Sequence, residues 1–145
     1  MFKHILVATD CTALGDRAIT MALRLAADAR VTALHVARDY GMADFAAASF
    51  QAGRDLHDLR ERLSQAAQRR IQQVIERFGE SARRIEARVA IGDRPYEEII
   101  ATADRLACDL IVMATHGRGA VESALLGSQT LKVLSLARQP VLVVR

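Results

Sequence analysis

The sequence contains no tryptophan, and only 4% of its 145 residues are aromatic, so aliphatic side chains must fill the core. The chain is nevertheless 51% apolar, and its length allows a core to be buried without disulfides or metal ions. That length is typical of one domain. No linker, repeat or low-complexity segment divides the chain, so we expect one domain over residues 1–145.

Long apolar runs are also absent, and none approaches the roughly 20 residues that a membrane-spanning helix needs. The apolar stretch near the N-terminus is too short for a signal peptide, and no small-residue cleavage site follows it. These absences favour a soluble cytoplasmic protein that does not act at a membrane.

The chain has only two cysteines, Cys11 and Cys108, and they lack the spacing of metal ligands. Cys108 stands in the apolar segment "LACDLIV" and is predicted to be a small buried side chain. Cys11 follows Asp10 in a predicted loop, where we expect partial exposure. No neighbouring group marks either residue as an activated thiol.

The net charge is +3, and arginines are densest between residues 54 and 88. Acids alternate with them in "RDLHDLRERL", which is typical of a solvent-exposed helix face with ion pairs. No aromatic stacking platform accompanies the positive charge, so we do not expect nucleic-acid binding.

Hydrophobic periodicity predicts strands alternating with helices. We expect strands over residues 4–9, 31–37, 85–91, 109–115 and 140–145. We expect helices over residues 13–29, 54–79, 95–107 and 128–137, and an irregular excursion over 38–53, where Met42 and Phe45 would cover an apolar patch. This order predicts an α/β fold, an open parallel sheet with right-handed crossovers and helices on both faces.

Such sheets bind ligands beyond the carboxyl ends of their strands. Beyond the fourth strand, Gly117 and Gly119 would let the backbone approach a ligand, with Arg118 adding charge. Gly127 and Ser128 open the following helix, whose first amides favour an anion. The pattern predicts a phosphate cradle, although the glycines could simply turn the chain and Ser128 could simply cap the helix.

Two further residues lie where the rest of a nucleotide would sit. Asp10 ends the first strand and could accept hydrogen bonds from a ribose or base, and the backbone of Val36 could meet an adenine edge. Asp10 could instead form a turn with its own backbone, and Asp93 beside Gly92 is predicted to be a turn or N-cap residue.

Neither a Walker loop nor a dinucleotide fingerprint is present. No lysine stands where it would neutralise charge developing on a γ-phosphate, so we do not expect fast hydrolysis.

Over nearly its whole length the chain resembles the universal stress proteins. The resemblance rests on "ILVATD", "ALHV", "GDRPYEEIIATADRLACDLIVMATHGRGA", "LLGS" and "QPVLVVR", in this order. It implies one universal stress protein domain of the Rossmann-like adenine-nucleotide alpha hydrolase type, with five strands in the order 3-2-1-4-5. It also implies ATP as the ligand, alone or with Mg²⁺, and a homodimer.

The ATP-binding branch of that family has the motif G-x2-G-x9-G-[ST]. Gly117 and Gly127-Ser128 match its second half, whereas Ala114 stands at its first glycine. The resemblance implies that Asp10 and Val36 hold the adenosine end and that the backbone amide of Gln129 reaches a phosphate.

The dimer has local support in the apolar strand predicted over 140–145. An exposed apolar edge strand is a pairing hazard, and pairing with a second copy about a two-fold axis would cover it.

Three functions stay open at this point. The first is a stress-response or signalling protein that binds a nucleotide and hydrolyses it slowly or not at all. The second is a nucleotide-free homodimeric interaction module of the same fold, which the alanine at position 114 favours. The third is a weak ATPase or an adenylyl-transfer enzyme, although no paired base and nucleophile are evident in the loops.

Overall fold

The computed structural model describes residues 1–38, 56–115 and 126–145. Its strands are β1 (His4–Ala8), β2 (Arg30–Ala37), β3 (Ile85–Ile91), β4 (Leu110–Ala114) and β5 (Val141–Val144). Its helices are α1 (Ala13–Leu25), α3 (Leu56–Glu76), α4 (Pro95–Arg105) and α5 (Ser128–Leu136), with a short 3-10 helix η1 (Gly79–Arg84) before β3. The expected excursion over 38–53, with Met42 and Phe45, lies outside the described residues except for Arg38.

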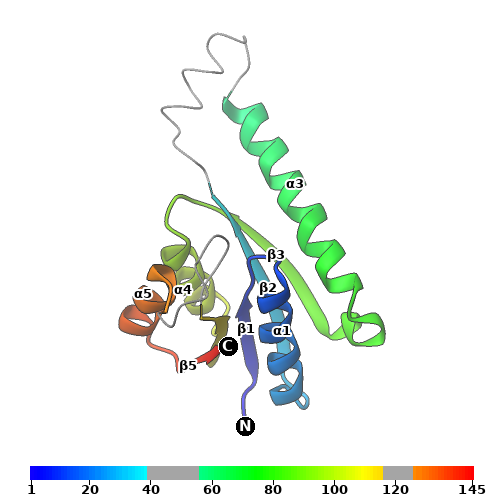
Figure 1. Ribbon diagram of the computed structural model, residues 1–145, viewed down its shortest axis with the longest axis vertical. Coiled ribbons are helices and arrows are strands. Elements are labelled where there is room, and N and C mark those ends of the chain that lie inside the picture. Colours follow the sequence, from blue (N-terminus) through cyan, green and yellow to red (C-terminus); the bar gives the residue numbers. More distant parts are fainter. Residues whose placement is uncertain (39–55, 116–125) are drawn as a thin grey trace.

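The five strands form one parallel sheet in the order β3-β2-β1-β4-β5, which confirms the predicted fold class and strand order. Helices α1 and α3 cover one face, and α4 and α5 cover the other (Figure 1). The central strand β1 is buried on both faces, because Ile5 and Val7 pack toward α1 and Leu6 packs toward α4.

The predicted helices are correct in type and extend too far at their C-terminal ends. The helix expected over 13–29 ends at Leu25. It cannot continue to residue 29, because Ala27 has a φ of 39°, which an α-helix does not allow. In the same way α4 stops at Arg105 before Ala107, whose φ is 51°. Gly79, expected to stop the long helix, does have a positive φ of 56°, but α3 ends at Glu76 and η1 follows.

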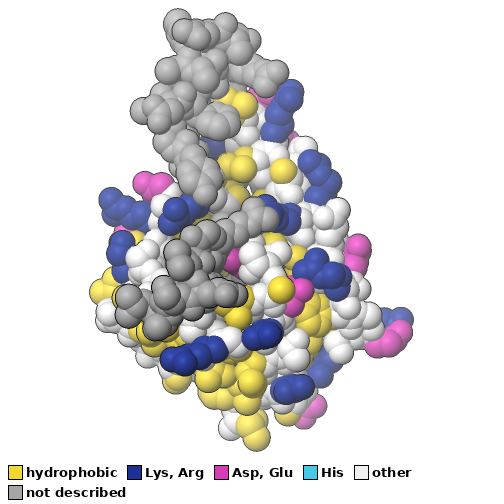
Figure 2. Space-filling model, viewed as in Figure 1, with side chains coloured by type: hydrophobic (Ala, Val, Ile, Leu, Met, Phe, Trp, Pro, Cys, Tyr) yellow, Lys and Arg dark blue, Asp and Glu magenta, His cyan; other side chains and the backbone are white. Residues whose placement is uncertain are grey.

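Helix α3 buries only the C-terminal half of its predicted apolar stripe, where Ala67, Ile71, Val74 and Ile75 lie in the core. Its N-terminal half projects past the end of the sheet (Figure 1). The expected surface ion pairs are present: Arg62 binds Asp58 one turn away at 2.9 Å. Lysine and arginine side chains are scattered over the face shown in Figure 2 and do not gather into one patch.

A carboxylate ties the starts of β1 and β4 together. Asp109 accepts hydrogen bonds from the backbone N–H groups of Lys3, at 2.7 Å, and His4, at 3.0 Å. Burial by itself would raise the pKa of Asp109, but the backbone hydrogen bonds, with those from Lys3 and His4 first among them, together with the nearby His4 hold the pKa below its ordinary value. The ionised form therefore contributes stability in the folded state.

We expect the free energy of unfolding to fall as the pH drops below about 4, since Asp109 protonates more readily in the unfolded chain. The contribution is complete above the unfolded pKa and is lost as the pH falls through the lower, folded pKa. In urea unfolding experiments, the free energy of unfolding of Asp109→Asn should therefore change less with pH than that of the wild type between about pH 4 and pH 2. The exposed Asp28 gives a matched control, and an equal flattening in Asp28→Asn would contradict this account.

Candidate functional site

The carboxyl ends of β1, β2 and β4 lie side by side at one edge of the sheet. Ala8 of β1 is in register with Leu34 of β2 on one side and with Met113 of β4 on the other. The chain leaves β1 toward β2 and later returns to β4 on the opposite side, so strand order reverses between β1 and β4. In open α/β sheets this reversal marks the ligand-binding crevice.

Asp10, two residues beyond the end of β1, uses its two carboxylate oxygens differently. Oδ1 accepts hydrogen bonds from the backbone N–H of Thr12, at 3.1 Å, and from its hydroxyl, at 2.6 Å. This is the turn that the sequence offered as the alternative role for Asp10. Oδ2 is buried and has no hydrogen-bond partner within the described residues. A buried carboxylate oxygen without a partner costs free energy, so a donor from a ligand would stabilise it.

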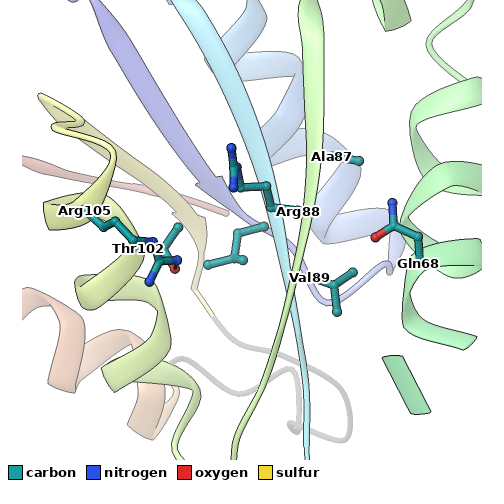
Figure 3. Close-up of a pocket in the computed structure, with 7 residues that line it drawn as sticks. Gln68, Ala87, Arg88, Val89, Thr102 and Arg105 are labelled. Atoms are coloured by element: carbon teal, nitrogen blue, oxygen red, sulfur yellow. Dashed lines mark hydrogen bonds between the residues drawn. The ribbon is translucent and has the colours of Figure 1, made fainter. Parts of the chain in front are cut away.

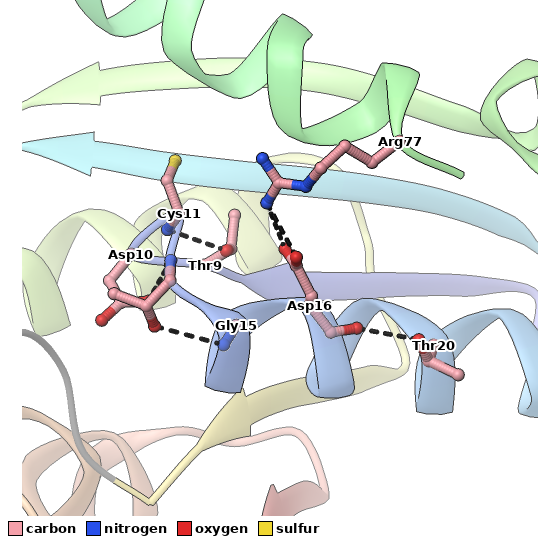
Figure 4. Close-up of polar contacts among 8 residues, drawn as sticks. Thr9, Asp10, Cys11, Gly15, Asp16, Thr20 and Arg77 are labelled. Carbon is pink, nitrogen blue, oxygen red and sulfur yellow. Dashed lines mark hydrogen bonds and ion pairs between the residues drawn. The ribbon is translucent and has the colours of Figure 1, made fainter. Parts of the chain in front are cut away.

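The turn after β1 is closely packed against the start of α1 (Figure 4). Thr12 caps α1 by accepting from the Gly15 N–H at 3.4 Å, and Thr9 accepts from the Cys11 N–H at 3.1 Å. Cys11 has a φ of 65° and is partly exposed, as expected for a loop residue. Gly15 has no Cβ to separate α1 from the Thr9 hydroxyl, so the helix approaches the end of β1 closely.

The start of α5 is fixed to the end of β4. The Gly127 N–H donates to the Thr115 carbonyl at 2.7 Å, and the buried Thr130 hydroxyl lies 3.1 Å from the carbonyls of both Ala114 and Thr115. The Gly127 amide is therefore already used within the fold. Ser128 is exposed.

The next three amides of this helix have no such partner. Within the described residues, no hydrogen bond involves the backbone N–H groups of Ser128, Gln129 or Thr130, which form the first turn of α5. The N-cap residue is Gly127, which has no side-chain acceptor and therefore makes no capping bond to these amides. Unbonded amides at the positive end of a helix dipole can bind an anion.

The register brings Asp10 and the start of α5 to the same crevice. If the pairing of Ala8 with Met113 continues past the strand ends, Asp10 is level with Thr115, whose carbonyl holds Gly127. Asp10, Ala114, Gly127 and Ser128 therefore lie around the same end of the sheet. Gly117, Arg118 and Gly119 lie outside the described residues.

Val36 lies at the end of β2, beyond the last paired residue of β1. The neighbouring Ala37 directs its carbonyl toward β3, where it accepts from the Gly92 N–H at 3.1 Å. Because successive residues of a strand in a parallel sheet point their backbone groups to opposite sides, Val36 directs its own toward the β1 side. This is the side on which the crevice lies.

Ala114, at the first position of the glycine motif, is buried at 9% exposure at the end of β4. It alternates with Met113 and shares a sheet face with Val112, which packs in the cluster containing α1. The methyl group of Ala114 therefore belongs to the packing beneath the crevice.

The model of the universal stress protein family matches residues 1–145. The chain belongs to the universal stress protein family. Universal stress protein MJ0531 of Methanocaldococcus jannaschii is 30% identical over 148 residues, which cover 100% of this chain and 83% of that protein.

Universal stress protein MJ0577 of the same organism is 28% identical over 89 residues, which are 61% of this chain and 54% of that protein, so the sequence match spans about half of its length. In structure, MJ0577 is similar with a TM-score of 0.78 at 27% identity, covering 99% of this chain and 96% of the other. A universal stress protein in complex with cAMP has a TM-score of 0.68 at 20% identity, covering 99% and 97%, which shows the fold alone.

The side chain of Gln129 has a role in this universal stress protein that the sequence did not reveal. Its Oε1 accepts a hydrogen bond from the Tyr96 N–H at 3.0 Å, in the first turn of α4. Helix α4 begins at Pro95, as the range 95–107 predicted, so the N-cap residue is Arg94 and not Asp93, and Arg94 makes no side-chain capping bond. Gln129 therefore caps α4 from a neighbouring helix, a contact between residues far apart in sequence.

The same helix start carries a small charged network. The Tyr96 hydroxyl donates to Glu97 at 2.8 Å and Arg94 binds the same oxygen at 3.0 Å, and these donors hold the pKa of Glu97 below its ordinary value. Lys132 of α5 lies 4.8 Å from the centre of the Tyr96 ring. Together with Gln129, this network joins the N-terminal ends of α4 and α5.

We expect Gln129→Ala to lower the free energy of unfolding by about 1 kcal/mol, which is typical of a lost helix cap. Gln129→Glu retains an acceptor oxygen and should lose less. If Gln129 also reaches a ligand through its backbone, nucleotide affinity should change little in Gln129→Ala. Urea unfolding and a nucleotide titration would separate the two roles, and a large loss of affinity with no loss of stability would contradict them.

The other cysteine behaves as a core residue, as expected. Cys108 is 5% exposed and packs in the cluster beneath α4 and α5. Burial raises the pKa of its thiol to about 11. Across residues 1–38, 56–115 and 126–145, no group of three histidine, cysteine, aspartate or glutamate side chains could hold a metal ion, and no helix there is long and apolar enough to cross a membrane.

Proposed function

We propose that this universal stress protein binds an adenine nucleotide, with ATP as the first candidate, in the crevice between β1 and β4. One observation supports the proposal: within the described residues, the first amides of α5 and Oδ2 of Asp10 have no hydrogen-bond partner, and they follow the neighbouring strands β4 and β1, between which the strand order reverses. Donors suit the phosphates, and the acceptor suits a ribose hydroxyl or a base amine. A universal stress protein of the same fold has been solved in complex with cAMP, so the fold is compatible with an adenine nucleotide as ligand.

In this arrangement the first amides of α5 bind phosphate, Asp10 binds the ribose or base, and the backbone of Val36 meets the adenine edge. Gly117, Arg118 and Gly119 would complete the phosphate loop. Mg²⁺ usually keeps several waters and binds largely through substrate phosphate oxygens. Any Mg²⁺ would therefore arrive with the nucleotide, and it would screen the phosphate charge.

We propose a stress-response or signalling role with slow or no hydrolysis. One oxygen of Asp10 is held by Thr12, and no lysine lies at the described part of the crevice. The site is therefore better suited to holding a nucleotide than to transferring its γ-phosphate.

We propose that the protein is a homodimer through β5. Strand β5 lies at an edge of the sheet, and all four of its residues are partly exposed. Leu131, Leu134 and Leu136 of the adjacent helix α5 are 49%, 41% and 59% exposed. Pairing of β5 with a second copy would satisfy its free edge.

Titration with a fluorescent ATP analogue tests nucleotide binding. We expect saturable binding to the wild type and about 10-fold weaker binding to Asp10→Asn, since the substitution replaces the free acceptor and can retain the turn with Thr12. Asp93→Asn changes an exposed acid beyond the end of β3 and should bind like the wild type.

No saturable binding up to millimolar concentration, with the protein folded, would reject the nucleotide. Native mass spectrometry of gently purified protein would then identify the alternative, a nucleotide-free homodimeric interaction module, by a dimer mass without retained ligand. The exposed leucines of α5 favour that module as the second candidate.

A further inference from the structure

A polar cavity lies beside the edge strand β3, and none of its described lining residues belongs to the crevice. Its volume is about 250 Å³, and its polar lining includes Arg88 of β3, Thr102 and Arg105 of α4, and Gln68 of α3. Figure 3 shows Arg88, Thr102 and Arg105 on the α4 side of β3, with Gln68 on the α3 side. Two guanidinium groups from different elements therefore border one concave surface.

Strand alternation explains why an arginine is here. Ile85, Ala87 and Val89 of β3 pack toward α3, so Glu86 and Arg88 point to the opposite face of the sheet. Leu34, in register with Arg88 on β2, contributes the apolar floor. The cavity thus lies at the edge of the sheet, where Arg88 and α4 line it on one face and Gln68, Ala87 and Val89 line it on the other.

The positive charge of the cavity is only partly balanced. Arg88 forms an ion pair with Glu86 at 2.6 Å through one terminal nitrogen, and both side chains are substantially exposed. Arg105 donates to the hydroxyl of Thr102 at 3.1 Å, and within the described residues it forms no ion pair. The three charged groups therefore leave one net positive charge at this surface.

One donor in the cavity has no acceptor. Nε of Arg88 is buried and lacks a hydrogen-bond partner within the described part of the chain. A buried, charged donor without a partner is costly, because it has lost water and gained nothing in exchange. An oxyanion in the cavity would offer an acceptor to the exposed part of the Arg88 guanidinium and would also reduce the repulsion between the two guanidinium groups.

We propose that Arg88 and Arg105 form a binding site for a small phosphate group, either inorganic phosphate or a phosphomonoester. Guanidinium groups match phosphate oxygens in geometry, and two of them from different elements suit a doubly charged tetrahedral anion better than a single carboxylate. Among the described residues that line the cavity, none is aromatic and could stack on a base. The site is therefore distinct from the nucleotide crevice in ligand as well as in position.

Orthophosphate titration of the full chain, followed by amide NMR at constant ionic strength, tests the site. The wild type should show saturable shifts at the amides around Arg88 and Arg105. Arg105→Gln and Arg88→Gln should each weaken the apparent affinity about 10-fold or more. Arg83→Gln removes an exposed arginine that pairs with Glu80 at 3.6 Å, and this matched control should respond like the wild type.

Two further arms separate this site from the crevice and identify the source of the phosphate. Gly127→Val is designed to block the crevice and should keep the phosphate-induced shifts near Arg88. A failure of the nucleotide proposal can therefore be told apart from a failure of the phosphate proposal. Glycerol 3-phosphate in place of orthophosphate distinguishes a phosphomonoester site, by tighter binding, from a site for the free ion. Absence of saturable shifts near Arg88, equal affinities in Arg105→Gln and Arg83→Gln, or shifts confined to α5 would each overturn the proposal.

Discussion

Gly127→Val should abolish nucleotide binding, weakening the apparent affinity at least about 100-fold, which corresponds to about 2.7 kcal/mol. A branched side chain at the N-cap of α5 would occupy the space in front of the free amides of Ser128 and Gln129. The fold should tolerate it, because Gly127 has a φ of −61° and a ψ of 153°, which any residue adopts. Titration with a fluorescent ATP analogue measures the loss.

Ala137→Val is the matched control for that variant. Ala137 lies at the other end of α5 with nearly the same backbone conformation, a φ of −68° and a ψ of 142°. The valine there adds similar bulk away from the crevice, so nucleotide affinity should stay within about two-fold of the wild type. Circular dichroism must remain native in both variants. Equal affinities in Gly127→Val and the wild type would place the phosphates elsewhere.

The architecture could be predicted from sequence because its determinants are local. Apolar strands such as 4–9 and 109–115 have no polar face, which is typical of parallel strands buried on both sides. The start of helix α4 is predicted by Pro95 and by the acidic residues in its first turn. Helix ends were less well predicted, since left-handed Ala27 and Ala107 have no glycine or proline to mark them.

The side-chain roles at the site could be predicted only in part. The position of Asp10 follows from the end of β1, and its turn with Thr12 is a local contact that the sequence suggested. The cap that Gln129 supplies to α4 joins residues 33 apart, so no local pattern encodes it. The cavity of Arg88 and Arg105 likewise depends on which face of an edge strand α4 leaves open, and the sequence alone does not show this.

The tight approach of α1 to β1 gives the largest expected effect on stability. A Cβ at Gly15 would lie 2.4 Å from Oγ1 of Thr9 and 3.1 Å from Oδ1 of Asp10. Thr9 is 5% exposed, and its hydroxyl holds the Cys11 N–H, so it cannot move without loss. Gly15→Ala should lower the free energy of unfolding by about 2 kcal/mol, even though alanine gains about 1 kcal/mol in helix propensity.

Urea unfolding tests this prediction, with Gly92→Ala as the matched control. A Cβ at Gly92 would meet Cγ and Oε1 of Glu98 at 3.1 Å, and that flexible side chain can give way, so the cost should be below about 1 kcal/mol. Thr9→Ala removes the hydroxyl that obstructs the new methyl. The double variant with Gly15→Ala should therefore lose less stability than the sum of the single losses.

The crowding that Gly15→Ala introduces should also lower nucleotide affinity. Displacing Thr9 and Asp10 would shift Oδ2 of Asp10 out of the crevice, so Gly15→Ala should also bind the ATP analogue more weakly while remaining folded. The double variant should recover part of this affinity as well, because the turn can then return to its place. Recovery of stability without any recovery of affinity would show that Asp10 does not contact the nucleotide.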